Sequence, residues 1–425
     1  MYGAGSYLAR VRQFTPNARK FLAYEFFLAL NAGIYGVIFN LYVLKLGYHE
    51  DFLGLILSIM SVSTGLFALP AAMICDRIGR RNTLILSSFM LAVSLALLYT
   101  IATGGMLMLM GGCYGIAMAF SIVAGNPFMA ENSSREERMH LFSMNSVVYT
   151  VAAIFGNLGG GMLPMVIAGL TGTSPEAILP YRYTLYLSFI AVLITLVPLL
   201  LIRENRPPVV ARSERLRLVA QVIRTPNVQR LVIVNILIGI GAGMIVPFFN
   251  VYFHKVLSAP TDQIGVIFSI GQVTMVVGLL LIPLITERVG KVRTIAITQL
   301  LSIPFLILIA ITTNIYLAGF AYVMRMTFMN MANPAISSFN MELLGDRERA
   351  TVGSLTSMGW NIFLALSTYL SGIMMANGNY MLPYLITCVV YLLAAVAYYV
   401  FFLRIEKEKE STVKVAVIAE PARKS

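Results

Sequence analysis

The stretch at residues 76–81, Asp-Arg-Ile-Gly-Arg-Arg, lies between two long apolar segments of the chain and is the most informative part of the sequence about its fold. A degenerate copy, Glu-Arg-Val-Gly-Lys, occupies residues 287–291, 211 positions later. In both copies an acidic residue is followed by a basic one, and a glycine precedes a further basic side chain. Because glycine permits backbone conformations that turn the chain sharply, each copy predicts a short basic turn between two helices. A chain that carries the same turn twice is predicted to contain two related halves.

The repeat extends well beyond this turn. The matching segments, at a spacing of 210 or 211 residues, are Phe39-Asn40-Leu41-Tyr42 and Lys45 with Phe249-Asn250-Val251-Tyr252 and Lys255, then Asp51, Gly54, Ser58 and Ile59 with Asp262, Gly265, Ser269 and Ile270, and finally Glu131 and Glu137-Arg138 with Glu342 and Glu348-Arg349. Parallel repeats with a ligand site between them near the membrane midplane are a known plan of transporters.

The composition is that of a protein embedded in a lipid bilayer. Of 425 residues, 58% are hydrophobic and 12% are charged, and the mean hydropathy is +0.80, whereas soluble domains are about 25% charged. A spanning helix needs about 20 mostly apolar residues. The segments that meet this requirement are Phe21–Leu44, Phe52–Ile74, Thr83–Ala102, Met106–Met129, Leu141–Leu170, Tyr183–Ile202, Leu231–Phe253, Ile264–Ile285, Thr294–Thr313, Tyr316–Ile336, Thr351–Met375 and Leu382–Leu403.

The basic residues assign the sides of these twelve spans. Twenty-seven of the 31 Lys and Arg residues fall at the termini or in loops on one side. Only Lys45, Arg182 and Lys255 fall on the other side, and Arg325 lies within a span. Because cytoplasmic loops are enriched in Lys and Arg, both termini are predicted to be cytoplasmic.

Several other classes of protein are disfavoured by the residues present. The net charge of +12 comes from short strips between apolar runs, which argues against a nucleic-acid partner. The cysteines and histidines are scattered without metal-ligand spacing, and no nucleotide-binding loop or catalytic triad occurs. We therefore expect no enzyme activity, no cofactor and no metal site. We also expect no cleavable signal peptide, because the chain opens with a polar, basic stretch and its first apolar run is long enough to span a membrane. The dispersed residues are Cys75, Cys113, Cys388, His49, His140 and His254.

The predicted fold is an all-α membrane protein of twelve transmembrane helices in two pseudo-symmetric six-helix bundles. The expected division is residues 1–203 for the N-terminal bundle, 204–230 for a cytoplasmic linker, 231–405 for the C-terminal bundle and 406–425 for a cytoplasmic tail. Within the linker, Ser213–Val222 could form an amphipathic surface helix or remain an unstructured connection.

The residues around the first turn resemble the signature of the major facilitator superfamily, Gly-x3-Asp-Arg-x-Gly-Arg-Arg in the loop between the second and third helices. Asp76, Arg77, Gly79, Arg80 and Arg81 match it, while an alanine, Ala72, replaces the first glycine. With twelve spans and a central loop, the resemblance covers essentially the whole chain. It implies the fold of that family and transport as its activity.

The fifth span resembles, in part, a motif of drug:proton antiporters, Gly-x3-Gly-Pro-x2-Gly-Gly. Gly156, Gly160 and Gly161 match, while Ala152 and Asn157 replace the first glycine and the proline. The resemblance implies export, although small residues could equally serve close helix packing. The arginine that those exporters often carry in the fourth helix is absent, since Gly111 and Tyr114 lie near its expected place.

The paired turns are interpreted as a cytoplasmic gate. A carboxylate that faces a helix amino terminus is stabilised by about 0.3–1 kcal/mol, and contacts formed only in one state bias a two-state equilibrium. Topology-setting charge without a gating role is the alternative. The proposed gate residues are Asp76, Arg77, Gly79, Arg80, Arg81, Glu131, Arg138, Glu287, Arg288, Gly290 and Lys291.

Two ionisable residues within spans are the candidates for coupling and binding. A charge at the bilayer centre costs about 2.5–3.5 kcal/mol, so such residues usually face a wet cavity or a partner. We assign Glu25 as the proton-carrying acid and Arg325 as an electrostatic partner or anion anchor. Glu25 could instead reach toward the headgroups, and Arg325 could form a structural ion pair.

Helical spacing predicts the lining of a substrate cavity around these residues. Gly36 and Asn40 share a stripe with Glu25, and Tyr322 shares one with Arg325. Asn235 is the repeat equivalent of Glu25 and shares its stripe with Asn250. The full set assigned to the cavity is Arg325, Gly36, Asn40, Asn235, Asn250, Gln272, Tyr322 and Asn361.

The sequence thus predicts a secondary active transporter that works by alternating access, with proton-coupled export of an amphipathic or drug-like molecule as the first choice. A lipid or glycolipid flippase, an importer of a sugar or organic anion, and a receptor-like protein on this fold are the alternatives. The expected partners are a small-molecule substrate, protons and the lipid bilayer, and the expected state is a monomer. Short loops favour a plasma membrane of the bacterial inner-membrane type.

Overall fold

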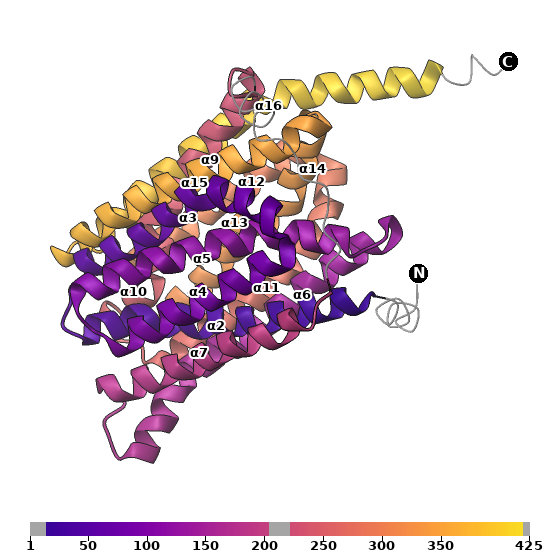
Figure 1. Ribbon diagram of the computed structural model, residues 1–425. Coiled ribbons are helices and arrows are strands. Elements are labelled where there is room, and N and C mark those ends of the chain that lie inside the picture. Colours follow the sequence, from indigo (N-terminus) through magenta and orange to yellow (C-terminus); the bar gives the residue numbers. More distant parts are fainter. Residues whose placement is uncertain (1–13, 204–221, 420–425) are drawn as a thin grey trace.

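A computed structural model describes residues 14–203 and 222–419, and within these ranges the chain is helical and contains no strand. The first bundle consists of α2 (Pro16–Lys45), α3 (Glu50–Ile78), α4 (Arg80–Thr100), α5 (Gly104–Glu131), α6 (Arg135–Thr171) and α7 (Ile178–Leu200). The second consists of α9 (Pro226–Ile245), η1 (Val246–Phe248), α10 (Phe249–Lys255), α11 (Thr261–Val289), α12 (Lys291–Ile311), α13 (Ile315–Met331), α14 (Asn333–Leu343), α15 (Asp346–Ala376) and α16 (Met381–Ala419). Figure 1 shows these helices running roughly parallel, with α2 beginning and α16 ending at the same end of the molecule.

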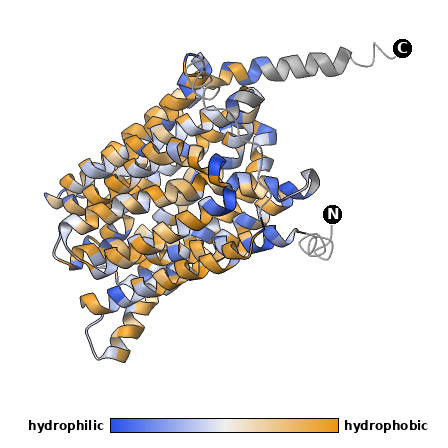
Figure 2. Ribbon diagram, viewed as in Figure 1, coloured by the Kyte–Doolittle hydropathy of each residue, from blue (hydrophilic) through white to orange (hydrophobic). Residues whose placement is uncertain are grey.

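Eleven helices of the described chain are long and apolar enough to cross a membrane, α9 to α10 counting as one. Figure 2 shows hydrophobic residues along the middle of the helices and hydrophilic residues gathered at the end where α2 begins. The expected span Tyr316–Ile336 is instead divided, because α13 ends at Met331 and α14 begins at Asn333, with a proline in its first turn. Proline removes a backbone donor and clashes with the preceding turn. Pro247 interrupts the seventh span in the same way, as part of η1.

The two basic turns have the same backbone conformation. Gly79 ends α3 and precedes α4 with φ +90°, and Gly290 ends α11 and precedes α12 with φ +90°. This region of φ favours glycine, which explains why both copies of the turn carry one. The predicted amphipathic helix at Ser213–Val222 lies, except for Val222, outside the described residues.

Two pairs of helices form the main contacts between the bundles, α3 with α15 and α6 with α11. In each pair the backbones meet at glycines. A Cβ atom at Gly54 would lie 3.1 Å from the Cα atom of Gly372, and one at Gly161 would lie 3.1 Å from the Cα atom of Gly265. Gly54 and Gly265 are repeat equivalents, as are Gly161 and Gly372, so the two contacts are related by the pseudo-symmetry of the fold.

The bundles are joined at one face of the molecule and separate at the other. We call the face with Arg80 and Lys291 the basic face, and the face with Glu50 and Lys255 the opposite face. Toward the opposite face a single hydrophobic core contains residues of both bundles, such as Tyr42 and Tyr252. Toward the basic face each bundle has a core of its own, around Phe21 and Phe128 in the first and around Phe339 and Phe402 in the second. The chain is therefore described in a conformation closed toward the opposite face.

Candidate functional site

A cavity of about 590 Å³ lies where the two bundles meet. Its walls come mainly from the second bundle, namely α9 to α13, the start of α14, α15 and α16, with α2 and α3 contributing from the first. A site of this size suits a small organic molecule. Six of the eight residues assigned to a cavity from the sequence line it: Gly36, Asn40, Asn235, Asn250, Tyr322 and Arg325.

Arg325 is the charged residue of this lining. Its side chain is buried on α13, with 4% of its surface exposed. One Nη atom donates to the hydroxyl of Tyr391 at 2.8 Å, and the guanidinium carbon lies 5.3 Å from the ring centre of Phe249 and 5.7 Å from that of Tyr391. Its Nε atom is buried without a hydrogen-bond partner. Neutral groups thus surround the cation, and among the described residues it makes no ion pair.

Asn40 and Asn250, which are repeat equivalents, close the cavity toward the opposite face. Asn40 donates through Nδ2 to the carbonyl of Pro247 at 2.5 Å and to Oδ1 of Asn250 at 2.9 Å. Asn250 donates in turn to the carbonyl oxygens of Gly36 and Val37 at 3.1 and 3.0 Å. The N–H of Val251, four residues after Pro247, donates to Oδ1 of Asn250 at 3.0 Å, and the Pro247 carbonyl accepts the Asn40 side chain at the break in the helix. The pair therefore binds α2 of one bundle to the broken helix of the other.

Some lining residues were missed by the sequence analysis. Gln299 is 2% exposed on α12, and its Oε1 atom has no hydrogen-bond partner. A glutamine in the middle of an apolar run was the available signal, since buried polar groups are otherwise paired. Trp360, the single tryptophan of the sequence, also lines the cavity, as do Tyr35 and Tyr391.

Two residues expected in the cavity lie elsewhere. Asn361 on α15 is directed at α3, since a Cβ atom at Gly65 would lie 3.0 Å from that of Asn361, and its amide donates to the carbonyl of Ser357. Gln272 on α11 is not part of the lining. A polar residue in a span can serve helix packing as well as binding, and spacing along one helix does not separate the two.

Glu25 is half-buried on α2 and does not line the cavity. Its Oε1 atom lies 4.0 Å from the place of a Cβ atom at Gly125 on α5. Among the described residues it has no hydrogen bond and no ion pair. It is thus a carboxyl group within a span that no cation neutralises, on the basic-face side of the cavity level.

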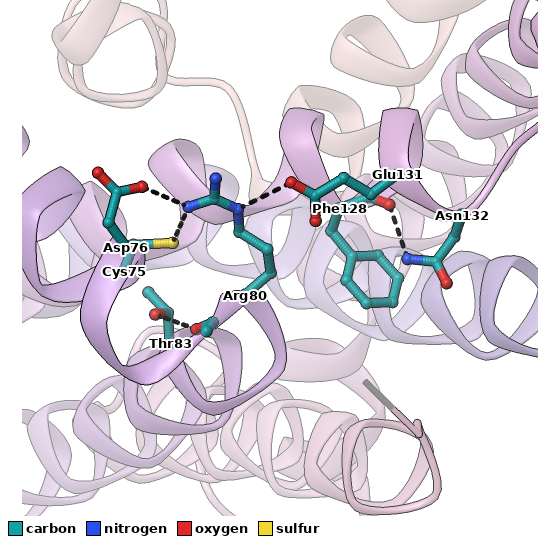
Figure 3. Close-up of polar contacts among 8 residues, drawn as sticks. Cys75, Asp76, Arg80, Thr83, Phe128, Glu131 and Asn132 are labelled. Carbon is teal, nitrogen blue, oxygen red and sulfur yellow. Dashed lines mark hydrogen bonds and ion pairs between the residues drawn. The ribbon is translucent and has the colours of Figure 1, made fainter. Parts of the chain in front are cut away.

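At the basic face, the residues assigned to a gate form a cluster within the first bundle (Figure 3). Arg80 donates to Oδ1 of Asp76 at 3.0 Å, to the sulfur of Cys75 at 3.1 Å and to Oε1 of Glu131 at 3.3 Å. Neighbouring arginines cap helix ends of the same bundle: Arg81 donates to the carbonyls of Leu199 and Leu200, and Arg138 to that of Ala130.

The second bundle has its own cluster. Lys291 pairs with Glu342 and donates to Ser338 at 3.0 Å. Glu406 on α16 accepts from the backbone N–H of Lys291 at 2.6 Å, at the start of α12. Arg77, Glu287 and Arg288 are exposed. These contacts of Arg80 and those of Lys291 thus each lie within one bundle.

The glycines of the fifth span pack against two different helices. A Cβ atom at Gly156 would lie 2.4 Å from the carbonyl oxygen of Leu30, and one at Gly160 would lie 3.0 Å from the Cα atom of Ile34, both on α2. Gly161 instead faces α11, where a Cβ atom would lie 2.7 Å from the carbonyl oxygen of Thr261. The motif therefore lies at the junction of three helices, one of them from the other bundle.

A polar network that the sequence analysis did not anticipate joins the bundles at the opposite face. Lys255 of the second bundle lies 2.8 Å from Oε1 of Glu50, which also accepts from the hydroxyl of Tyr380 at 2.7 Å. Burial, together with this bond to a carboxylate, raises the pKa of Tyr380 well above its ordinary value, so the phenol remains a donor. Glu176 of the first bundle pairs with Lys45 at 2.5 Å and lies 3.8 Å from His254.

Comparisons with known proteins agree with this architecture. The family model of the Major Facilitator Superfamily matches residues 21–229 and 231–424. An efflux pump, azaK of Aspergillus niger, is 34% identical over 110 residues, and this match spans 26% of the chain and 23% of that relative.

Solved structures of two transporters share the fold. A bacterial homologue of the human lysosomal transporter Spinster, in an inward-facing and occupied conformation, has a TM-score of 0.72 at 15% identity and covers 95% of this chain and 98% of its own. The nucleoside transporter NupG has a TM-score of 0.69 at 16% identity, over 91% of this chain and 99% of its own. At these identities the likeness concerns the fold alone. With a family model that matches nearly the whole chain, two six-helix bundles and a cavity at their contact, this chain belongs to the major facilitator superfamily.

Proposed function

We propose that the protein is a proton-coupled exporter of an amphipathic small molecule that works by alternating access. We propose that it resides in a plasma membrane of the bacterial inner-membrane type. Members of its family are transporters rather than enzymes. The observation that carries the proposal is the cavity between the bundles, which the pair Asn40–Asn250 closes on one side while the bundles separate on the other.

The orientation follows from the charges of the loops. Because Lys and Arg are retained on the cytoplasmic side, we expect the basic face and both termini to face the cytoplasm. The described conformation then opens its cavity inward, where an exporter collects its substrate. Separation of the bundles at the glycine contacts would open the other side. We expect a monomer to suffice, since the cavity lies within one chain.

Glu25 is proposed as the group that carries the proton. An ionisable residue within a span is a functional candidate by default, and a carboxyl group without a cationic partner is free to gain and lose a proton during the cycle. Its position on the basic-face side allows release of a proton to the cytoplasm in the inward-open conformation. The efflux pump that matches a quarter of the chain is consistent with export.

The test uses purified protein in proteoliposomes, with substrate flux and luminal pH recorded together. Wild type is expected to move substrate faster when the pH gradient is imposed, and each turnover should shift luminal pH. Glu25→Gln is expected to abolish both gradient effects, whereas the control Glu408→Gln, an exposed residue on α16, should retain them. A flux that follows the pH gradient equally in wild type and Glu25→Gln would remove the role of Glu25, and a flux that ignores the gradient in wild type would remove proton coupling.

A further inference from the structure

The charged side chains that line the cavity are not balanced in sign. Among its lining residues Arg325 carries a positive charge, and none carries a negative one. The remaining polar lining consists of neutral groups, among them the amides of Asn235, Gln299 and Asn330. The cavity therefore has a fixed positive charge without a counter-ion from the described chain.

Arg325 is only partly satisfied by its surroundings. The Tyr391 hydroxyl takes one donor, and the rings of Phe249 and Tyr391 face the cation at 5.3 and 5.7 Å. The Nε–H is buried with no acceptor. A buried cation that lacks a paired anion is costly, and guanidinium donors fit carboxylate oxygens well. A ligand oxygen with a negative charge would therefore complete this site.

The walls beside Arg325 fit a flat apolar body. Tyr322 stacks on Phe268 with ring centres 5.0 Å apart and planes at 18°, and Phe249 meets Tyr322 edge to face at 4.9 Å. Met326 and Met329 flank them, and Trp360 closes another part of the lining. Thioethers and aromatic rings adapt to varied ring systems.

We infer that the cavity binds amphipathic aromatic monoanions, with a carboxylate held by Arg325 and the ring system held among the aromatic residues of the second bundle. The inference rests on the proposed function only in taking this cavity as the transport site. The substrate is anchored to one bundle, since the cation, its phenol partner and the stacked rings all belong to α10, α11, α13 and α16. The first bundle adds Tyr35, Gly36, Asn40 and Leu57.

Trp360 supplies the readout, because it is the single tryptophan of the chain and lies in the cavity. Three probes of one shape are titrated in nanodiscs without any gradient: para-bromophenylbutanoate, its neutral butanamide and its butylammonium analogue. The bromine quenches tryptophan fluorescence at contact. We expect the butanoate to bind at least about tenfold more tightly than the amide, and the ammonium to bind most weakly, since hydrogen bonds to charged groups contribute about 1.5–3 kcal/mol.

Substitutions at Arg325 test whether this residue causes the preference for the anion. Arg325→Met is expected to weaken butanoate binding on the order of ten- to a hundredfold and leave the amide unchanged, while Arg325→Lys keeps the preference for the anion. Arg404→Gln, at an exposed position on α16, is the control. Should Arg325→Met not fold, the ranking of the three probes on wild type decides by itself.

Equal affinity for butanoate and butanamide, or a preference for the ammonium, would overturn the inference. Displacement of bound butanoate by millimolar-range inorganic phosphate alone would also overturn it, because the site would then serve small inorganic anions. Anion-selective binding without proton-driven flux would leave the inference standing and reject the proposed function. Proton-driven flux of other substrates without a preference for anions would support the proposed function and overturn the inference.

Discussion

Replacing Gly161 by alanine is the sharpest perturbation of the conformational equilibrium that the fold offers. The new methyl group would lie 2.7 Å from the carbonyl oxygen of Thr261 and 3.1 Å from the Cα atoms of Asp262 and Gly265 on α11. Favourable contacts of carbon atoms lie at about 3.5–4.0 Å, so α6 and α11 must move apart by a few tenths of an ångström or more. These three atoms belong to the backbone, so a rotamer change cannot relieve the clash.

The penalty applies only where the two helices touch. Overpacking of this kind costs about 1–3 kcal/mol, and it is borne by the conformation closed toward the opposite face. A free-energy change of that size shifts a two-state equilibrium by about 5- to 150-fold. Gly161→Ala should therefore populate the conformation in which the opposite face opens and the basic face closes.

Spin labels on the basic-face ends of α6 and α11 measure the shift. Met139 and Leu284 are exposed there, and labelling them as Met139→Cys and Leu284→Cys requires prior replacement of Cys75, Cys113 and Cys388. The distance distribution is expected to move to shorter values in Gly161→Ala. Gly169→Ala, on the same helix with no atom within 4 Å of the new methyl group, should match wild type. Identical distributions in wild type and Gly161→Ala would refute the assignment of this contact to the closed face.

Three further substitutions test the contact at the opposite face and two polar groups of the second bundle. Lys255→Met should open the opposite face more than Glu50→Gln, as measured by cysteine accessibility at that face. The Glu50 side chain is 3% exposed and that of Lys255 is 41% exposed, and leaving a buried charge without its partner costs more than removing the charge. The reverse order would argue against a role of this pair in closing the face. Gln299→Leu should raise the melting temperature of the ligand-free protein, since a buried unpaired carbonyl oxygen costs about 1–3 kcal/mol; a lower temperature would indicate that its amide has a partner. Glu406→Gln should lower the melting temperature, because a carboxylate that accepts from the first N–H of α12 stabilises that helix by about 0.3–1 kcal/mol. An unchanged melting temperature would contradict this capping role.

The internal repeat of the sequence predicted much of the fold and part of the candidate site. Gly79 and Gly290 were recognisable as paired turns, and both have φ +90°. Asn40 and Asn250 stand at equivalent positions of two copies of one tetrapeptide, and each bonds to the other half. Arg325 was identifiable because a charge within an apolar span is costly unless it has a use.

Features that depend on contacts between distant segments were beyond local patterns. The breaks at Pro247 and Asn333 depend on single prolines that many spanning helices tolerate, as Pro283 within α11 illustrates. Glu406 caps a helix that begins 115 residues earlier, and the pair of Glu50 with Lys255 joins residues of different bundles. Gln272 and Asn361 share the composition of cavity residues but face other surroundings, because orientation depends on how neighbouring helices pack.

Uptake into inside-out proteoliposomes under a clamped membrane potential measures whether export is coupled to protons. An exchange of one anion outward for one proton inward moves two positive charges toward the cytoplasm per cycle, worth about 4.6 kcal/mol for each 100 mV. We predict that an acidic lumen and a lumen-positive potential each accelerate accumulation of para-bromophenylbutanoate, and that Glu25→Gln abolishes the response to pH. Accumulation that equals that of protein-free vesicles, or that ignores both gradients, would contradict it.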